Sequence, residues 1–238
     1  MKNILFLLFI FSLISCADDD FLRSDLERLR NDHVAETGPD GLKLKSKGSL
    51  YSYSYFYHTN GFVDSIRWFN NWQGNSTSKK FIYDNLNRII SIKTYDIIPQ
   101  APKFNKIDIT YYKYNSINQI ISSLTYDKDS VAIAYNTYSY NRDGSLFNPS
   151  IKIENGNIVK EGAVTYEFDQ TPNPLYTIYP KAYRILNQVN KNNITLTKYS
   201  NDYFHVHTLK YNDKGYIIEE KISNMPTDTD DHFGYSYY

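Results

Sequence analysis

Two histidines on one predicted strand are the residues of this sequence best suited to hold a metal ion. His205 and His207 flank Val206, and this spacing places both imidazoles on one face of a β-strand. A zinc site needs further ligands, and no third one with a suitable spacing is present, Asp202 being the nearest candidate. We therefore interpret both as ordinary strand histidines and predict no metal and no cofactor.

An acidic run near the C-terminus is the second candidate for metal chemistry. Asp228, Asp230 and Asp231 precede His232 in the segment TDTDDH. The run lacks the glycine and the terminal glutamate of an EF-hand loop. We interpret it as a solvated hairpin loop, with a weak calcium site as the alternative.

Motifs for catalysis are missing from the sequence. It contains no nucleophile-elbow pattern, no phosphate-binding glycine loop and no H-E-x-x-H segment. A hydrolase is not excluded, because the two carboxylates of a glycosidase are paired in space and not in sequence. The sequence favours a protein that binds without catalysing a reaction.

The two tryptophans are the best candidates for ligand binding. Trp68 and Trp72 lie in RWFNNW (67–72), beside a phenylalanine and two asparagines. Exposed aromatic rings with neighbouring amides can stack on sugar rings, and an exposed aromatic patch usually marks a binding surface. The alternative is that both rings pack in the core or at a sheet edge.

The only cysteine follows a segment that predicts export. Residues 4–14 form an apolar run of about 11 residues, too short to span a bilayer as a helix but of the length of a signal-peptide core. Residues 13–16 read LISC and resemble a bacterial lipobox, which implies removal of residues 1–15 and lipidation of Cys16. The alternative is a plain secretory signal with a chance cysteine.

Three aspartates follow the cysteine. Asp18, Asp19 and Asp20 resemble the acidic export signal of Bacteroidota surface lipoproteins, which implies display on the outer face of the outer membrane. The alternatives are a solvated linker on the periplasmic face and an inner-membrane retention signal. Retention usually needs an aspartate directly after the cysteine, and here Ala17 intervenes.

Charge and aromatic content limit the class of protein. The chain has 26 basic and 26 acidic residues and no basic stripe, so we predict no nucleic-acid partner. It has 24 tyrosines, a residue that favours half-buried pleated surfaces. The sequence therefore predicts a β protein.

A tether links the anchor to the folded domain. Residues 16–48 contain leucines at helical spacing and the capping-box segment SDLE (24–27), which predict a short helix over about 24–32. Residues 35–48 are polar with Gly and Pro and are typical of a linker. We place the start of the domain at residue 49.

One short pattern recurs five times in the predicted domain. Tyr is followed four residues later by Gly or Asn and six residues later by an aliphatic residue. The copies are YHTNGFV (57–63), YDNLNRI (83–89), YNSINQI (114–120), YNRDGSL (140–146) and YNDKGYI (211–217). This spacing predicts a type I turn with a G1 bulge, in which the Gly or Asn adopts positive φ. Each copy is therefore predicted to be a β-hairpin.

The hairpins must pair side by side, because a single hairpin is only marginally stable. The sequence thus predicts one all-β domain over 49–238, an antiparallel meander forming a twisted single sheet or an open barrel. Pro172 and Pro174 interrupt the pattern, so we expect a loop or short helix at about 170–190 covering one end of the sheet.

The pattern resembles the YD repeats of Rhs-type proteins, most closely in residues 83–89. Together with the lipobox and the NPLY and NNIT segments, it resembles a family of uncharacterised Bacteroidota lipoproteins, which implies fold and location but no activity. Asp64-Ser65-Ile66 and Asp129-Ser130-Val131 look like Bacteroidota O-glycosylation sites, of which Ser130 is the better candidate.

Three functions remain open at this point. The first is a surface-exposed lipoprotein that binds a glycan or protein partner without catalysis, held to the membrane by its lipid anchor. The second is a structural or assembly component of the cell envelope. The third is a hydrolase accessory to polysaccharide use.

Overall fold

The computed structural model describes residues 42–49, 51–70, 74, 76–98, 103–200, 202–225 and 229–238. The signal peptide, Cys16, the three aspartates, the predicted helix at about 24–32, and Trp72 lie outside the described residues. Those predictions therefore stay predictions.

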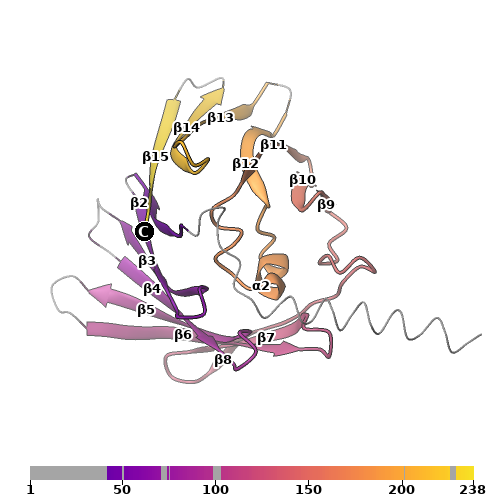
Figure 1. Cartoon of the computed structure of the whole chain (residues 1–238). Helices are drawn as coiled ribbons and strands as arrows, with labels where there is room; N and C mark the ends of the chain where they lie inside the picture. Colours follow the sequence, from indigo (N-terminus) through magenta and orange to yellow (C-terminus); the bar gives the residue numbers. More distant parts are fainter. Residues whose placement is uncertain are drawn as a thin grey trace, which may run out of the picture.

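The described strands form one antiparallel sheet, which confirms the predicted all-β meander (Figure 1). In chain order the elements are β1 (Leu44–Gly48), β2 (Tyr51–Tyr57), β3 (Val63–Asn70), β4 (Ser76–Tyr83), β5 (Ile89–Ile98), β6 (Lys103–Tyr114), β7 (Ile120–Asp127), β8 (Ala132–Thr137), β9 (Ile151–Glu154), β10 (Asn157–Glu161), β11 (Val164–Pro172), α2 (Lys181–Leu186), β12 (Asn192–Lys198), β13 (Phe204–Tyr211), β14 (Ile217–Met225) and β15 (Thr229–Tyr237).

The first and last strands meet in the middle of the sheet. The strand order runs from β8 back to β1, continues with β15, and runs back to β9. The sheet curls around α2 but does not close into a barrel, and β8 and β9 are its two edges (Figure 1). The pairing of β1 with β15 is the seam that joins the two arms of the sheet.

The seam corrects the predicted start of the domain. Gly48 pairs with Gly234 and Lys47 with Tyr235, so residues 44–48 are a strand and not part of a linker. A Cβ on Gly48 would lie 2.5 Å from Ser52 Cα and Tyr51 O, so only glycine fits where β1 turns into β2. The alternation of Leu42 and Leu44 with lysines was the signal for this strand, and the polar composition concealed it.

The five predicted turns have the expected backbone geometry. The turn residue has positive φ in each: Gly61 (88°), Asn87 (58°), Asn118 (59°), Gly144 (83°) and Gly215 (80°). In the second copy, Asp84 Oδ1 accepts the backbone N–H groups of Leu86 and Arg88 at 2.9 and 3.0 Å. The fourth copy departs from the prediction, since its flanks form only the isolated bridge Tyr140–Leu146.

A sixth turn of this type escaped the sequence pattern. Asp127 Oδ1 accepts the N–H groups of Asp129 and Val131, both at 2.9 Å, and Ser130 adopts a φ of 65°. Serine occupies the place that Gly or Asn fills in the other copies. The positive φ therefore could not be expected from its residue type.

The first three predicted turns lie along one end of the meander, because consecutive ones are separated by two strands. Neighbouring turns are hydrogen-bonded to each other: Asn60 Nδ2 donates to Asn87 Oδ1 at 2.9 Å, and Arg88 Nη1 donates to Asn118 Oδ1 at 3.1 Å. The asparagines at positive φ thus both form a turn and join it to the next one.

Five tyrosines hold neighbouring strands together through their hydroxyl groups, and we call them the tyrosine spine. Each donates a hydrogen bond to a backbone carbonyl: Tyr57 to Leu44 (2.7 Å), Tyr83 to Val63, Tyr114 to Ile89 (2.8 Å), Tyr140 to Ile120 (2.6 Å) and Tyr237 to Ile217 (2.9 Å). Four of the five carbonyls belong to the aliphatic residue at the end of a repeat. For Tyr83, Tyr114 and Tyr140, the constant spacing of the repeat therefore sets the Tyr of one copy against the aliphatic residue of the copy before it.

The same aliphatic residues form the core. Leu44, Val63, Ile89 and Ile120 are the largest fully buried side chains. Burial raises the pKa of the spine tyrosines, in the case of Tyr140 to about 12. The spine is therefore protonated at physiological pH and acts as a set of hydrogen-bond donors.

The predicted short helix is present, but its position differs from the prediction. α2 lies on the concave side of the sheet between the two arms and does not cover one end (Figure 1). Its Tyr183 packs edge-on against Phe81 at 5.9 Å and Tyr112 at 6.1 Å. A curled sheet leaves its concave side open, and this segment fills it. We call the face toward α2 the inner face and the opposite one the outer face.

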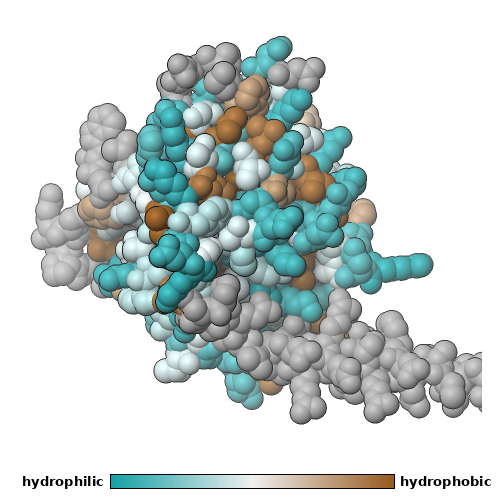
Figure 2. All heavy atoms as spheres, turned by 45° about the horizontal axis from the view of Figure 1, so that its top comes forward, coloured by the Kyte–Doolittle hydropathy of each residue, from teal (hydrophilic) through white to brown (hydrophobic). Residues whose placement is uncertain are grey.

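Apolar side chains are not confined to the interior. In Figure 2 hydrophobic side chains gather in small groups between hydrophilic ones on the surface. Such groups are of interest where they coincide with a hollow and with unpaired charges.

Candidate functional site

Trp68 lines a pocket on the inner face, beyond the core, and we call it the tryptophan pocket. Its volume is about 480 Å³, and it is lined by Lys47, Tyr51, Tyr53, Trp68, Asn70 and Phe233. These residues come from β1, β2, β3 and β15, so the pocket lies across the seam. Trp68 thus lies among aromatic side chains and next to Asn70, and its predicted role in ligand binding remains a prediction.

Strand register assembles the aromatic wall of this pocket. Tyr53 pairs directly with Trp68 across β2 and β3, and Tyr51 pairs with Asn70. The rings of Tyr51 and Trp68 are nearly parallel, with centroids 5.9 Å apart. Tyr51 is 50% exposed and Tyr53 is 39% exposed, so flat ring surface is open to solvent. An arrangement of this kind can stack against the apolar face of a sugar ring.

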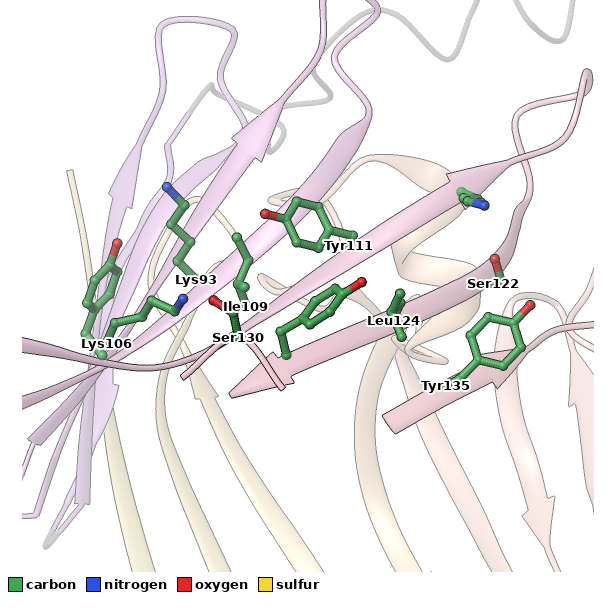
Figure 3. A pocket seen from close by; sticks show the side chains of 11 residues that line it. Lys93, Lys106, Ile109, Tyr111, Ser122, Leu124, Ser130 and Tyr135 are labelled. Carbon is green, nitrogen blue, oxygen red and sulfur yellow. The ribbon is translucent and has the colours of Figure 1, made fainter. Parts of the chain in front are cut away.

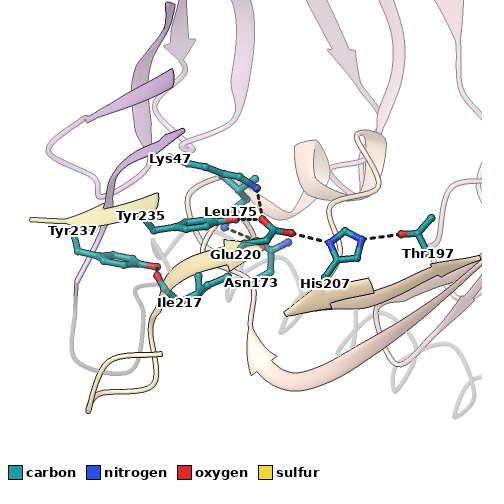
Figure 4. A network of polar contacts seen from close by, with 9 residues as sticks. All are labelled: Lys47, Asn173, Leu175, Thr197, His207, Ile217, Glu220, Tyr235 and Tyr237. Carbon is teal, nitrogen blue, oxygen red and sulfur yellow. Dashed lines mark hydrogen bonds and ion pairs between the residues drawn. The ribbon is translucent and has the colours of Figure 1, made fainter. Parts of the chain in front are cut away.

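Lys47 connects the tryptophan pocket to a buried polar network (Figure 4). Its ammonium lies 3.1 Å from Glu220 Oε2 and 4.9 Å from the centroid of the Tyr235 ring. Tyr235 donates its hydroxyl to the same carboxylate oxygen at 2.6 Å. Because Lys47 is on β1 and Glu220 on β14, the network spans the seam.

His207 completes the network on the other side of the carboxylate. Its Nδ1 lies 2.9 Å from Glu220 Oε1, and its Nε2 lies 3.2 Å from Thr197 Oγ1. Burial alone would raise the pKa of Glu220, but the hydrogen bonds from His207 and Tyr235 and the charge of Lys47 lower it to about 2. The carboxylate is therefore ionised over the physiological range.

The order of hydroxyl, imidazole and carboxylate resembles that of a nucleophilic triad. A nucleophile must be reached by substrate, but Thr197 is 6% exposed and Glu220 is 8% exposed. The hydroxyl is enclosed between paired strands. The arrangement satisfies a buried carboxylate and fastens the seam, and we assign it no catalytic step.

The remaining predicted candidates are separated from one another. His205 lies on the same face as His207, as predicted, but it contacts Tyr199 and Tyr203, with Nε2 3.1 Å from the Tyr203 hydroxyl. Asp230, Asp231 and His232 lie within β15 and not in a loop, which corrects the prediction for that part of the run. Asp230 forms an ion pair with Lys221 at 2.7 Å. In the described part of the chain, no three His, Cys, Asp or Glu side chains come together to hold a metal ion.

Both predicted glycosylation serines are described. Ser65 lies in β3, where its hydroxyl donates to Asp64 Oδ2 at 3.2 Å. Ser130 lies in the exposed turn between β7 and β8, the more accessible of the two positions. Modification at either position remains a prediction.

No family model and no curated protein matches this chain. Among solved structures, it is similar to a porin-like protein from Bacteroides uniformis ATCC 8492, with a TM-score of 0.46 and 9% identity over 83% of this chain and 95% of that chain. A porin-like protein from Bacteroides vulgatus ATCC 8482 gives a TM-score of 0.30 and 8% identity over 85% of this chain and 91% of that chain.

TcdB2–TccC3 without its hypervariable C-terminal region gives a TM-score of 0.22 and 14% identity. The similarity covers 76% of this chain but only 9% of TcdB2–TccC3. At these scores no function follows from any of the three. The resemblance to uncharacterised Bacteroidota lipoproteins therefore stays a prediction. Within the described ranges, no helix has the length and apolar character needed to cross a membrane.

Proposed function

We propose that this protein is a lipid-anchored protein of the outer membrane that binds a glycan without catalysis, with the tryptophan pocket as its binding site. One observation carries the proposal: Tyr51, Tyr53 and Trp68 present ring surface beside the Asn70 amide in a hollow of about 480 Å³. Ligand sites combine apolar surface with a few polar groups that fix orientation.

The strand pairing supports a preformed site. Tyr53 and Trp68 are held by direct register, and Lys47 is fixed by Glu220 across the seam. Rings that are already ordered lose little conformational entropy when a ligand binds. A flat stacking surface beside one ammonium group fits an oligosaccharide better than it fits a small apolar molecule.

Calorimetric titration with a panel of neutral oligosaccharides tests the binding site. Trp68→Ala should weaken binding at least about tenfold, since a hot-spot aromatic contributes more than about 1 kcal/mol. Phe69→Ala is the matched control, because Phe69 is the next residue of β3, is 39% exposed and points to the outer face. Equal binding by wild type and Trp68→Ala, with both proteins folded, would contradict the proposal.

The location is tested by protease treatment of intact cells. Wild type is expected to be digested, whereas replacement of Asp18, Asp19 and Asp20 by alanine is expected to give protection, because the acidic signal is lost. Cys16→Ser should release the protein from the membrane fraction. Protection of both proteins until lysis would place the domain on the periplasmic side.

A further inference from the structure

The outer face carries a second hollow, remote from the tryptophan pocket, which we call the tyrosine–lysine groove. Its volume is about 680 Å³, and it lies over β5, β6, β7 and β8. Its lining is Lys93, Tyr95, Lys106, Ile109, Tyr111, Lys113, Ser122, Leu124, Tyr126, Ser130 and Tyr135. Figure 3 shows Lys93 and Lys106 at one end of the groove and Tyr135 at the other.

Register brings these side chains into rows across the sheet. Tyr111 pairs with Leu124, which pairs in turn with Tyr135. Ile109 pairs with Tyr126 in the next row. Tyr111 is 47% exposed and Tyr135 is 67% exposed, and the rings of Tyr111 and Tyr126 meet edge-on at 6.1 Å. The groove floor is therefore an ordered aromatic surface that is open to solvent.

The charge of the groove is of one sign. Three lysines line it, and no Asp or Glu is among its lining residues. Lys93, Lys106 and Lys113 form no ion pair with any described residue, whereas lysines elsewhere in the described part of the chain do, among them Lys47, Lys80, Lys128, Lys152, Lys210 and Lys221. The groove thus concentrates ammonium groups that lack an internal counter-ion.

One of these ammonium groups also faces a like charge. Lys93 pairs with Lys80 across β4 and β5, and Lys80 is bound to Asp64. Like charges opposite each other on neighbouring strands are destabilising. Lys80 thus has its counter-charge in Asp64, and an anion in the groove would supply one to Lys93.

We propose that the tyrosine–lysine groove binds an acidic oligosaccharide, one whose pyranose rings carry carboxylate or sulfate groups. The tyrosine rings stack on the sugar faces, their hydroxyls and that of Ser130 hydrogen-bond to sugar hydroxyls, and the lysines pair with the acidic substituents. This inference does not depend on the tryptophan pocket, which lies on the opposite face of the sheet.

Single-stranded nucleic acid is the competing polyanion, since it also stacks on aromatic rings. The observations favour the sugar. No arginine lines the groove, and the chain as a whole has a formal net charge of +0, so it offers no extended positive field for a phosphate at every residue. Three lysines spread over a groove of four strands suit an oligosaccharide that carries fewer charges per residue than a nucleic acid.

The test is calorimetric titration with tetragalacturonate, neutral galactotetraose and poly(dT). We expect the detergent-solubilised full chain to bind tetragalacturonate, with an affinity that falls as salt rises, and not to bind the neutral sugar at this groove. The triple variant Lys93→Gln, Lys106→Gln and Lys113→Gln should weaken binding at least about tenfold. The control triple Lys152→Gln, Lys160→Gln and Lys210→Gln makes the same change of charge on the other arm and should have little effect.

Ring contacts are tested by Tyr135→Ala, at an exposed position on the edge strand, and by Tyr111→Ala. Each should weaken tetragalacturonate binding several-fold, and Phe69→Ala, on the outer face but outside the groove, should leave it unchanged. Tighter binding of poly(dT) than of tetragalacturonate would overturn the proposal. It would also be overturned if the lysine variant lost binding while both tyrosine variants kept it, because a simple ion site needs no rings.

Discussion

Tyrosines of one strand serve opposite purposes on the two faces of the sheet. On β6, Tyr114 faces inward and gives its hydroxyl to the Ile89 carbonyl at 2.8 Å, while Tyr111 faces outward and is 47% exposed. The inner residue belongs to the spine and the outer one to the groove. The abundance of tyrosine therefore has two causes, of which only the first is a requirement of the fold.

The spine compensates for the irregular strand pairing beside each turn. The register shifts between Lys113 and Tyr114 and between Ile82 and Tyr83, as it does at the other turns of this type that join paired strands. A bulge interrupts the ladder and leaves a backbone group without its strand partner. A buried carbonyl needs a donor, and the tyrosine hydroxyl supplies it. The outer tyrosines have no such task, and this leaves them free to contact a ligand.

The largest expected difference in stability is between alanine substitutions at two neighbouring isoleucines. Ile89→Ala should lower the free energy of unfolding by about 2–5 kcal/mol, because Ile89 is fully buried against the spine. Ile90→Ala removes the same atoms from a side chain that is 37% exposed and should cost about 0.5 kcal/mol or less. Chemical denaturation measures both values. Equal losses would mean that the buried residues of the repeats are not the core.

Acid should weaken the seam through Glu220. Its pKa of about 2 in the folded protein lies below the ordinary value of 4.5, so its stabilising contribution is complete above about pH 4.5 and is lost as the pH falls toward 2. The contribution is up to about 3 kcal/mol. The Tm of Glu220→Gln should therefore fall less than the Tm of wild type between roughly pH 5 and pH 2, the range in which Glu220 takes up a proton.

The exposed neighbour provides the control for this pH effect. Glu219 forms a surface ion pair with Lys210 at 2.9 Å, and Glu219→Gln should leave the pH profile of wild type nearly unchanged. If Glu219→Gln and Glu220→Gln flattened the profile equally, the seam network would not be the acid-sensitive element.

Removal of one hydroxyl of the tyrosine spine should lower the free energy of unfolding by an intermediate amount. Tyr83→Phe or Tyr114→Phe leaves a buried carbonyl without its donor and should cost about 1–3 kcal/mol. Tyr111→Phe removes a solvent-exposed hydroxyl and should change stability by about 0.5 kcal/mol or less. Denaturant midpoints of the three variants test the contrast directly.

The smallest effects concern the residue at positive φ in the turns. Ser130→Gly should stabilise the protein by up to about 1 kcal/mol, because glycine adopts the φ of 65° without strain. Gly215→Ser places a side chain at a φ of 80° and should destabilise it by about 1 kcal/mol. The same sign for both substitutions in thermal unfolding would exclude a common turn geometry.

The hairpins could be predicted from the sequence because their information is local. The segment YDNLNRI contains both the aspartate that caps the turn and the asparagine that adopts positive φ. The seam could not be predicted in this way, because it joins Leu44 in the first strand to Tyr237 in the last. The sixth turn was missed because Ser130 does not favour the conformation that it adopts.

The candidate sites were predictable only in part. Trp68 stands out by its rarity and its asparagine neighbours. The groove does not, because Tyr111, Tyr126 and Tyr135 are ordinary members of a tyrosine-rich sequence. Each bulge reverses the alternation of inward and outward side chains for the residues that follow it on the same strand. The face on which a given tyrosine lies is therefore known only from the complete strand register.

The most direct test of this account compares Tyr114→Phe with Tyr111→Ala in two assays, denaturant unfolding and titration with tetragalacturonate. We predict that Tyr114→Phe loses stability and retains binding, while Tyr111→Ala weakens binding several-fold and retains stability. If both variants lost stability alone, the outer tyrosines would be structural and the groove would not be a binding site.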